Sequence, residues 1–141
     1  MQFENTLRPD DRQMEAFFER AGTGQDGPVV MVNLLKFRDR AAYPDGRDAH
    51  ISGFEAYTRY GIAVKQIIER LGGRMLYVGA VDGLMIGECE ELWDQVALVE
   101  YPSRASLLEM VNSPEYHAIE VHRDAGLLGQ LNIGARTFLS L

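Results

Sequence analysis

Hydrophobic positions divide the chain into apolar runs and stretches with helical spacing. Residues 29–37 form an almost continuous apolar run rich in β-branched side chains, which is typical of a strand buried on both faces. Residues 74–81 and 94–101 predict two further strands, and the alternation in residues 130–141 predicts a last one. Residues 52–73 differ, because their apolar side chains recur at three- and four-residue steps, as on one face of a helix.

Capping signals mark where the predicted helices begin. Ser52 and Glu55 have the S-x-x-E spacing of a capping box. Ser103 can cap a helix that contains the run RASLLEMV, and Ser113 precedes a proline that suits a first helical position. Within the first of these helices, we expect Tyr57 on the core stripe and Tyr60 in a more open position.

These elements follow one another as a helix and then β-α-β-β-α-β. This order predicts an α+β fold of the ferredoxin-like, split-βαβ type, with both main helices on one face of a four-stranded antiparallel sheet. We expect one domain, in which residues 1–27 form an N-terminal helical extension, with its helix over 9–22, and residues 28–141 form the ferredoxin-like part. Residues 82–92 predict a loop or hairpin without a clear place in the fold.

The strands are apolar on both sides, so the sheet face without helices needs a cover. A bare apolar face is an association surface, and we therefore predict a homodimer through the open sheet face.

Charge and cysteine content narrow the functional classes. The 141 residues carry a formal net charge of −7, which argues against a nucleic-acid surface and against an anionic membrane surface. The single cysteine, Cys89, lies among glutamates, which disfavour a thiolate, and a lone cysteine fits a reducing compartment. The sequence shows neither a signal-peptide pattern nor a transmembrane run, so we expect a cytoplasmic protein.

Several segments together resemble a known bacterial family. In order along residues 28–128 they read VVMVNLLKF, EAYTRYGIAV, GGRMLYVG, WDQVALVEYPSRASLLEMVNSPEY and HRDAGL. The pattern resembles the family called domain of unknown function 1330, within the dimeric α+β barrel superfamily. The resemblance implies a ferredoxin-like fold and a dimer whose two sheets form a barrel. It implies no single activity, because the superfamily includes cofactor-free monooxygenases, lactone isomerases, heme enzymes and binding proteins, and fold does not choose among them.

Polar side chains on and beside the strands are candidate binding residues. Asn33 interrupts the most apolar run, where an unpaired amide costs roughly 1–3 kcal/mol, so it either holds a ligand or bonds a neighbouring segment. Tyr101 ends the third strand and Arg104 opens the next helix. That strand-to-helix turn suits an anion, although Arg104 also has an ion pair with Glu100 as a structural alternative.

The stretch PEYHAIEVHR contains the remaining candidates. At about 100° per residue, His122 falls within the apolar arc and His117 lies about 140° away, so the two cannot share a metal. Tyr116 and Arg123 lie on one edge, with His122 facing inward beside Arg123. Burial and the arginine charge should then lower the pKa of His122, which would make it a base near neutral pH. The structural alternative is a histidine bonded to a backbone carbonyl and an arginine that ties the helix down through Glu120 or a strand carboxylate.

Two functional interpretations stay open. The first is a pocket between sheet and helices that binds a small anionic or carbonyl-bearing molecule, with cofactor-free proton transfer of monooxygenase or isomerase type. There His122 would be the base, Arg123 or Arg104 would hold negative charge, and Asn33 and Tyr116 would orient the substrate. The second is a non-catalytic ligand-binding or assembly protein in which these residues are clamps. We expect neither a cofactor nor a metal, because no phosphate loop, nucleophile motif or ligand cluster is present in the sequence.

Overall fold

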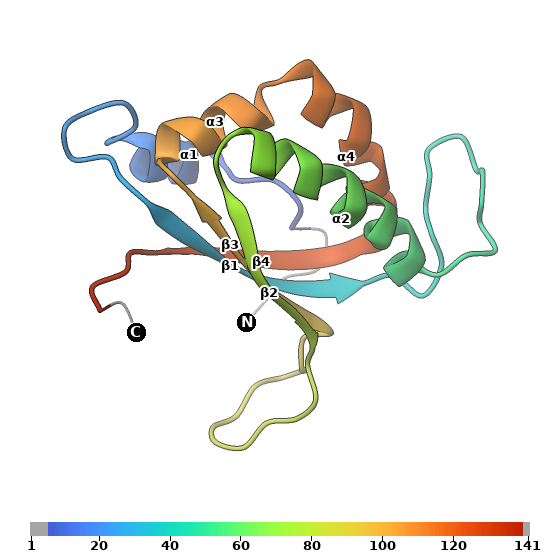
Figure 1. Cartoon of the computed structure of the whole chain (residues 1–141). Coiled ribbons are helices and arrows are strands. Elements are labelled where there is room, and N and C mark those ends of the chain that lie inside the picture. The colour runs from blue at the N-terminus through green and yellow to red at the C-terminus, as the bar shows by residue number, and fades with distance from the viewer. Residues whose placement is uncertain (1–5, 140–141) are drawn as a thin grey trace.

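The structure, a computed structural model, describes residues 6–139. Its helices and strands follow one another in this order (Figure 1): α1 (Asp11–Phe18), β1 (Val29–Phe37), α2 (Gly53–Arg70), β2 (Arg74–Ala80), β3 (Gln95–Tyr101), α3 (Arg104–Val111), α4 (Pro114–Gly126) and β4 (Leu127–Ala135). The predicted succession is therefore confirmed, with the second helix of the ferredoxin-like unit divided into α3 and α4.

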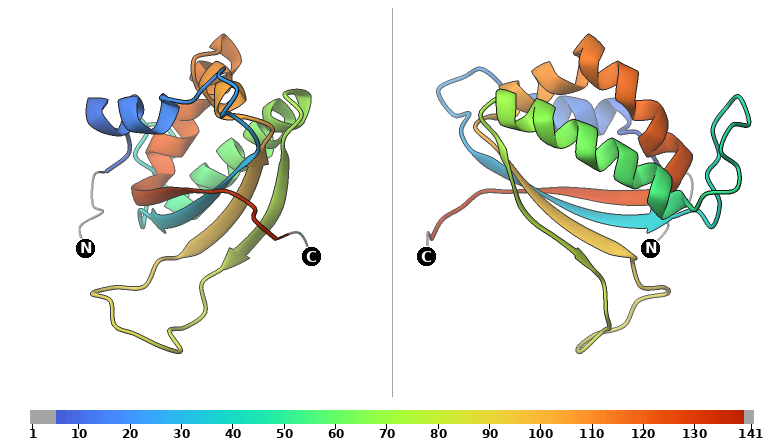
Figure 2. Two further views of the ribbon diagram at one scale, coloured as in Figure 1. Left: turned by 90° about the vertical axis from the view of Figure 1, so that its left-hand side faces the viewer. Right: turned by 45° about the vertical axis from the view of Figure 1, so that its right-hand side comes forward.

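One antiparallel sheet carries the fold. Its strands lie in the order β2-β3-β1-β4, so the first and third strands occupy the centre, as the ferredoxin-like arrangement requires. All of the helices over residues 6–139 lie on the same side of this sheet, and none of them covers the opposite side (Figures 1 and 2). Among the described residues, no helix is long and apolar enough to cross a membrane.

Helix α2 begins where the sequence predicts, but Tyr60 belongs to its buried face. Ser52 accepts from the backbone N–H of Glu55, and the Glu55 carboxylate accepts from that of Ser52, which completes the capping box. Tyr60 is 8% exposed and belongs to the core, whereas Phe54 is 53% exposed. The expectation that Tyr60 would be the more open tyrosine is wrong, because α4 covers this flank of α2.

Two glycines let α2 and α4 approach closely at one end. A side chain at Gly53 would collide with the Arg38 carbonyl oxygen, and one at Gly126 with the Gly53 carbonyl oxygen. The Arg38 N–H donates to the Gly126 carbonyl at 2.8 Å, and the Gly53 N–H donates to the Arg38 carbonyl at 3.1 Å. This junction joins the end of β1 to both helices.

The N-terminal helix is shorter than expected and packs on the main core. Asp10 and Gln13 form its capping box, and the helix ends at Phe18 rather than near residue 22. Phe17 and Phe18 pack against the buried cluster between the sheet and the helices.

The segment between β2 and β3 forms an arm that runs away from the sheet on the side opposite the helices (Figures 1 and 2). Its tip exposes Leu84, Met85 and Ile86, with Met85 96% exposed. At its base, Lys36 pairs with Glu91 at 2.7 Å, and the Lys36 ammonium also donates to the Leu92 carbonyl at 3.1 Å. The base of the arm is thereby fixed to the end of β1.

The last strand begins directly after α4, three residues before the predicted start. It ends at Ala135, and residues 136–139 are not part of a strand. The last two residues of the predicted strand lie outside the described part of the chain.

Candidate functional site

An inward-facing row of polar side chains connects β1, β4 and α4. The Asn33 amide nitrogen donates to the carbonyls of Met31 and Ala97, each at 3.3 Å, and its amide oxygen accepts from Gln130 Nε2 at 2.7 Å. Gln130 pairs with Leu35 across β1 and β4, which places its side chain on the helix-facing side of the sheet. The amide at Asn33 is therefore satisfied inside the chain.

Arg123 completes the row from α4. Its Nη2 donates to Gln130 Oε1 at 2.6 Å and to the Leu7 carbonyl at 2.7 Å, and its Nη1 donates to Asp124 at 3.1 Å. The side chain is only 12% exposed. We call Asn33, Gln130 and Arg123 the polar row. The sequence-based alternative tied Arg123 to Glu120 or to a strand carboxylate. In the structure its partners are instead the Gln130 amide, the Leu7 carbonyl and the neighbouring Asp124.

Tyrosine rings lie beside the row in the core. The Tyr60 hydroxyl donates to that of Tyr116 at 3.2 Å, and both rings are buried. Burial raises the pKa of Tyr57, Tyr60 and Tyr101 above the ordinary value, and the Arg123 charge opposes this only in part for Tyr57 and Tyr60. These three phenols are therefore neutral near pH 7 and can donate hydrogen bonds.

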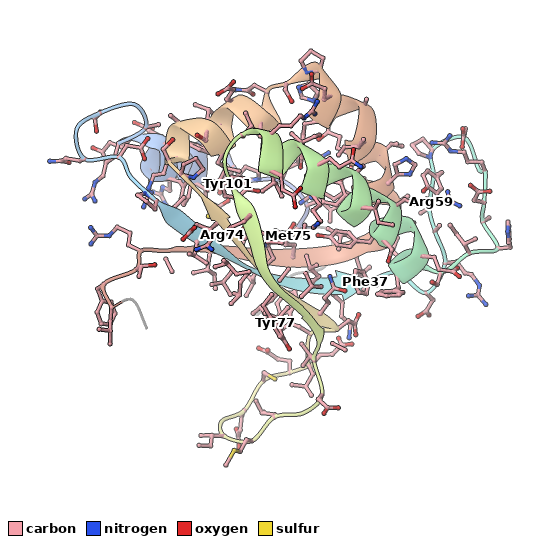
Figure 3. The ribbon with its side chains drawn as sticks, in the orientation of Figure 1. Phe37, Arg59, Arg74, Met75, Tyr77 and Tyr101 are labelled. Carbon is pink, nitrogen blue, oxygen red and sulfur yellow. The ribbon has the colours of Figure 1, made fainter. Side chains whose placement is uncertain are left out.

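His122 belongs to a different set of contacts from Arg123. Its Nδ1 lies 2.6 Å from the hydroxyl of the buried Tyr43, which also accepts from Arg59 Nη1 at 3.2 Å. Figure 3 places Arg59 between α2 and the loop of residues 38–52. The pKa of His122 is lowered, first by burial and then by the charges of Arg47 and Arg59. The predicted direction is confirmed, but the expected position beside Arg123, facing the interior, is wrong because the loop packs against this side of α4.

The anion-binding position expected at Arg104 is filled by a carboxylate of the chain. The two Asp26 oxygens accept from the backbone N–H groups of Arg104 and Ala105 at 2.8 and 3.1 Å. Burial by itself would raise the pKa of Asp26, but these bonds and those from Gly22 and Gly27 lower it to about 2. The Arg104 guanidinium donates to the Phe17 carbonyl at 2.7 Å and stacks on the Phe17 ring. The alternative pairing with Glu100 is also wrong, because Glu100 pairs with Arg74.

Tyr101 occupies the main core, 5% exposed, so its ring contributes packing rather than an open ligand contact (Figure 3). Two hollows among residues 6–139 lie away from the polar row. One, of about 80 Å³, lies between α2 and the α3–α4 junction, and the other lies near residues 19–25. No group of three or more histidine, cysteine or acidic side chains among the described residues could hold a metal ion.

Sequence reasoning missed three participants in these contacts. Gln130 had a usable signal, because it interrupts an apolar strand just as Asn33 does. Tyr43 lies in a polar loop, where no periodicity marks it as buried. Leu7 takes part through its backbone carbonyl, and because every residue has one, the residue type gives no sign of this contact.

Comparisons with known proteins give a fold and a family but no activity. No curated protein matches the chain. The structure of the methylated RPA0582 protein is similar, with 36% identity, a TM-score of 0.82, and coverage of 94% of this chain and 95% of that chain. The RPA0582 protein of unknown function from Rhodopseudomonas palustris has 34% identity, a TM-score of 0.82, and coverage of 96% and 98%.

A more distant structure shares the fold alone. It is described as a dimeric protein of unknown function with a ferredoxin-like fold from Bacteroides fragilis, with 13% identity, a TM-score of 0.51, and coverage of 79% and 97%. The family model described as domain of unknown function (DUF1330) matches residues 47–133, which is more than half of the chain. Together with the resemblance to the RPA0582 structures, this match shows that the chain belongs to the DUF1330 family.

Proposed function

We propose that this protein is a homodimeric binding protein for a small organic molecule that carries a carboxylate or carbonyl group. The observation that supports it is the polar row, in which Nη2 of Arg123, a side chain 12% exposed, donates to a side-chain amide and to a backbone carbonyl. Nη2 of this guanidinium has two neutral partners, whereas Nη1 pairs with Asp124. Nη2 is therefore suited to exchange one neutral partner for a carboxylate, because hydrogen bonds between charged groups are stronger.

The surroundings of Arg123 favour a ligand with both polar and apolar parts. The amides of Gln130 and Asn33 offer donors and acceptors on one side. Neutral tyrosines, among them Tyr57, supply ring surface and hydroxyl donors on the core side. A small acid with an apolar body would use both kinds of contact.

We propose binding rather than proton transfer. His122 interacts with Tyr43 and with the charges of the neighbouring loop, and none of its hydrogen bonds reaches the polar row. A general base must lie within hydrogen-bonding reach of the proton it removes. His122 therefore has no place in the proposed site.

The homodimer forms through the uncovered face of the sheet. The strand registers place these side chains on that face: Val30, Val32, Leu34, Tyr77, Val96, Leu98, Leu131 and Ile133. Tyr77 and Ile133 are 55% and 50% exposed, which is unfavourable for such an apolar surface in a monomer. The description of the Bacteroides fragilis protein as dimeric supports this assembly.

Thermal shift with small carboxylates and carbonyl compounds, including acetate, pyruvate, benzoate and acetone, tests the ligand proposal. A ligand at a hundredfold excess over its dissociation constant should stabilise the fold by about 2.7 kcal/mol. Arg123→Lys should weaken that effect, because lysine cannot reproduce a forked pair of donors. Arg12→Lys, on the exposed face of α1, is the matched control and should respond like the parent protein. Absence of a shift across the whole panel would overturn the ligand proposal.

Light scattering at micromolar concentration tests the assembly. The parent protein should have the mass of a dimer, and Leu98→Asp should have that of a monomer because a charge would be buried between the sheets. Ile62→Asp changes an equally apolar residue, 66% exposed on α2, and should leave the dimer intact. A monomeric parent protein would refute the assembly.

A further inference from the structure

The segment before α1 contacts the polar row at Arg123. The Leu7 carbonyl accepts a hydrogen bond from Arg123 Nη2 at 2.7 Å. The next residue, Arg8, donates from Nη1 and Nη2 to the two oxygens of Asp124, at 2.9 and 2.6 Å, and from Nη2 to Glu120 at 3.4 Å. We call residues 6–10 the strap.

Apart from the Leu7–Arg123 bond and the capping box of Asp10, the strap is held by exposed ion pairs. Within the described part of the chain, residues 6–9 make no backbone–backbone hydrogen bond. The side chains of Arg8, Asp124 and Glu120 are 50%, 36% and 27% exposed, and ion pairs at such positions contribute little to stability. Leu7 is the one half-buried residue of the strap, and the others are exposed. The strap can therefore separate from α4 at a small cost while the core stays folded.

The Leu7 carbonyl has the chemistry of a stand-in for a ligand oxygen. It is a neutral acceptor placed on a guanidinium that is otherwise largely buried. A ligand carboxylate would bring a full negative charge to the same nitrogen and form a stronger bond. Withdrawal of Leu7 would also vacate the half-buried position of this residue.

We propose that the strap is an autoinhibitory gate, which occupies the carboxylate position at Arg123 and is displaced when a small organic acid binds. This inference rests on the proposed function and adds that the strap must leave Arg123 before the ligand carboxylate can bind there. It also selects the ligand class, because a carboxylate competes with the Leu7 carbonyl for Arg123 better than a neutral carbonyl does. The measured affinity is then the intrinsic affinity reduced by the fraction of molecules in which the strap is open.

Arg8→Ala tests the gate, because it removes the ion pairs of the strap with Asp124 and Glu120 and leaves the three residues of the polar row unchanged. Arg12→Ala is the matched control, since it deletes the same charge on exposed α1. Calorimetry with sodium benzoate and sodium pyruvate should show about two- to tenfold tighter binding to Arg8→Ala than to the parent protein. Arg12→Ala should bind like the parent protein. Amide hydrogen exchange in the peptide containing residues 6–10 should accelerate when benzoate saturates the parent protein.

The outcomes separate the gate from the site itself. Equal affinities for the parent protein and both variants, with unchanged exchange in residues 6–10, would overturn the gate and leave the ligand site standing. If neither benzoate nor pyruvate binds to any of the three proteins, the proposed function is overturned, and the gate with it. Tighter binding to Arg8→Ala together with faster exchange on binding would support both.

Discussion

Gln130 is the middle of the polar row, and its replacement by leucine tests whether the row carries stability. The substitution removes the bond from Arg123 at 2.6 Å and the bond to Asn33 at 2.7 Å while it keeps most of the side-chain volume. It leaves the Asn33 oxygen and one Arg123 donor without these partners. A buried polar group left unsatisfied costs about 1–3 kcal/mol, and this pair is only partly buried. We therefore expect a total loss of about 1–3 kcal/mol in the free energy of unfolding.

Urea denaturation at a fixed protomer concentration measures this loss, because the stability of a dimer depends on concentration. The urea concentration at the midpoint of unfolding should fall, while the slope of the unfolding free energy against urea concentration stays the same. Asn132→Leu makes a similar amide-to-aliphatic change two residues along β4, at an exposed position, and should change stability by less than about 0.5 kcal/mol.

A double variant sharpens the test. Replacing both Asn33 and Gln130 by leucine removes both members of the amide pair, and such replacements are often close to neutral. We expect the double variant to be more stable than the sum of the two single changes predicts. A Gln130→Leu variant no less stable than Asn132→Leu would refute the idea that the row is an energetically coupled unit.

Three further predictions concern helix packing, pH and capping. Gly126→Ala should lower the free energy of unfolding by about 1–3 kcal/mol, because the added methyl group would collide with the Gly53 carbonyl. Gly61→Ala has open space around it and should raise that free energy by about 0.5–1 kcal/mol. Urea denaturation measures both changes. The folded pKa of His122 lies below that of the unfolded chain, so its contribution to stability is present above about pH 6.5 and is lost as pH falls below that value. Denaturation from pH 7.5 to 5 should show this fall, and His122→Gln should reduce it. An unchanged profile in His122→Gln would contradict the assignment. Asp26→Ala should lower the free energy of unfolding by about 1–2 kcal/mol in thermal or urea denaturation, because it leaves the N–H groups at the start of α3 without their acceptor. An unchanged free energy of unfolding would show that water replaces the carboxylate without loss.

Local sequence was sufficient for the elements and their order. The capping box of Ser52 and Glu55, the apolar run of β1 and the proline after Ser113 all act through short-range physics, so each could be placed from its neighbours in the chain. The sequence also showed that the Asn33 amide needed a hydrogen-bond partner. An unpaired amide in an apolar strand is costly whichever residue could have paired with it, so the need could be predicted without knowing the partner.

What the sequence by itself determined is therefore which helices and strands form and in what order, and which polar groups had to be satisfied. Only the tertiary structure decided their partners. Arg123 meets Gln130 and the Leu7 carbonyl, and His122 meets Tyr43, across separations that no periodicity encodes. Helix spacing placed His122 and Arg123 side by side because they are consecutive residues, but consecutive helical residues point about 100° apart and contact different neighbours. The packing of the strap and of the loop of residues 38–52 against α4 therefore sets the chemistry of each side chain.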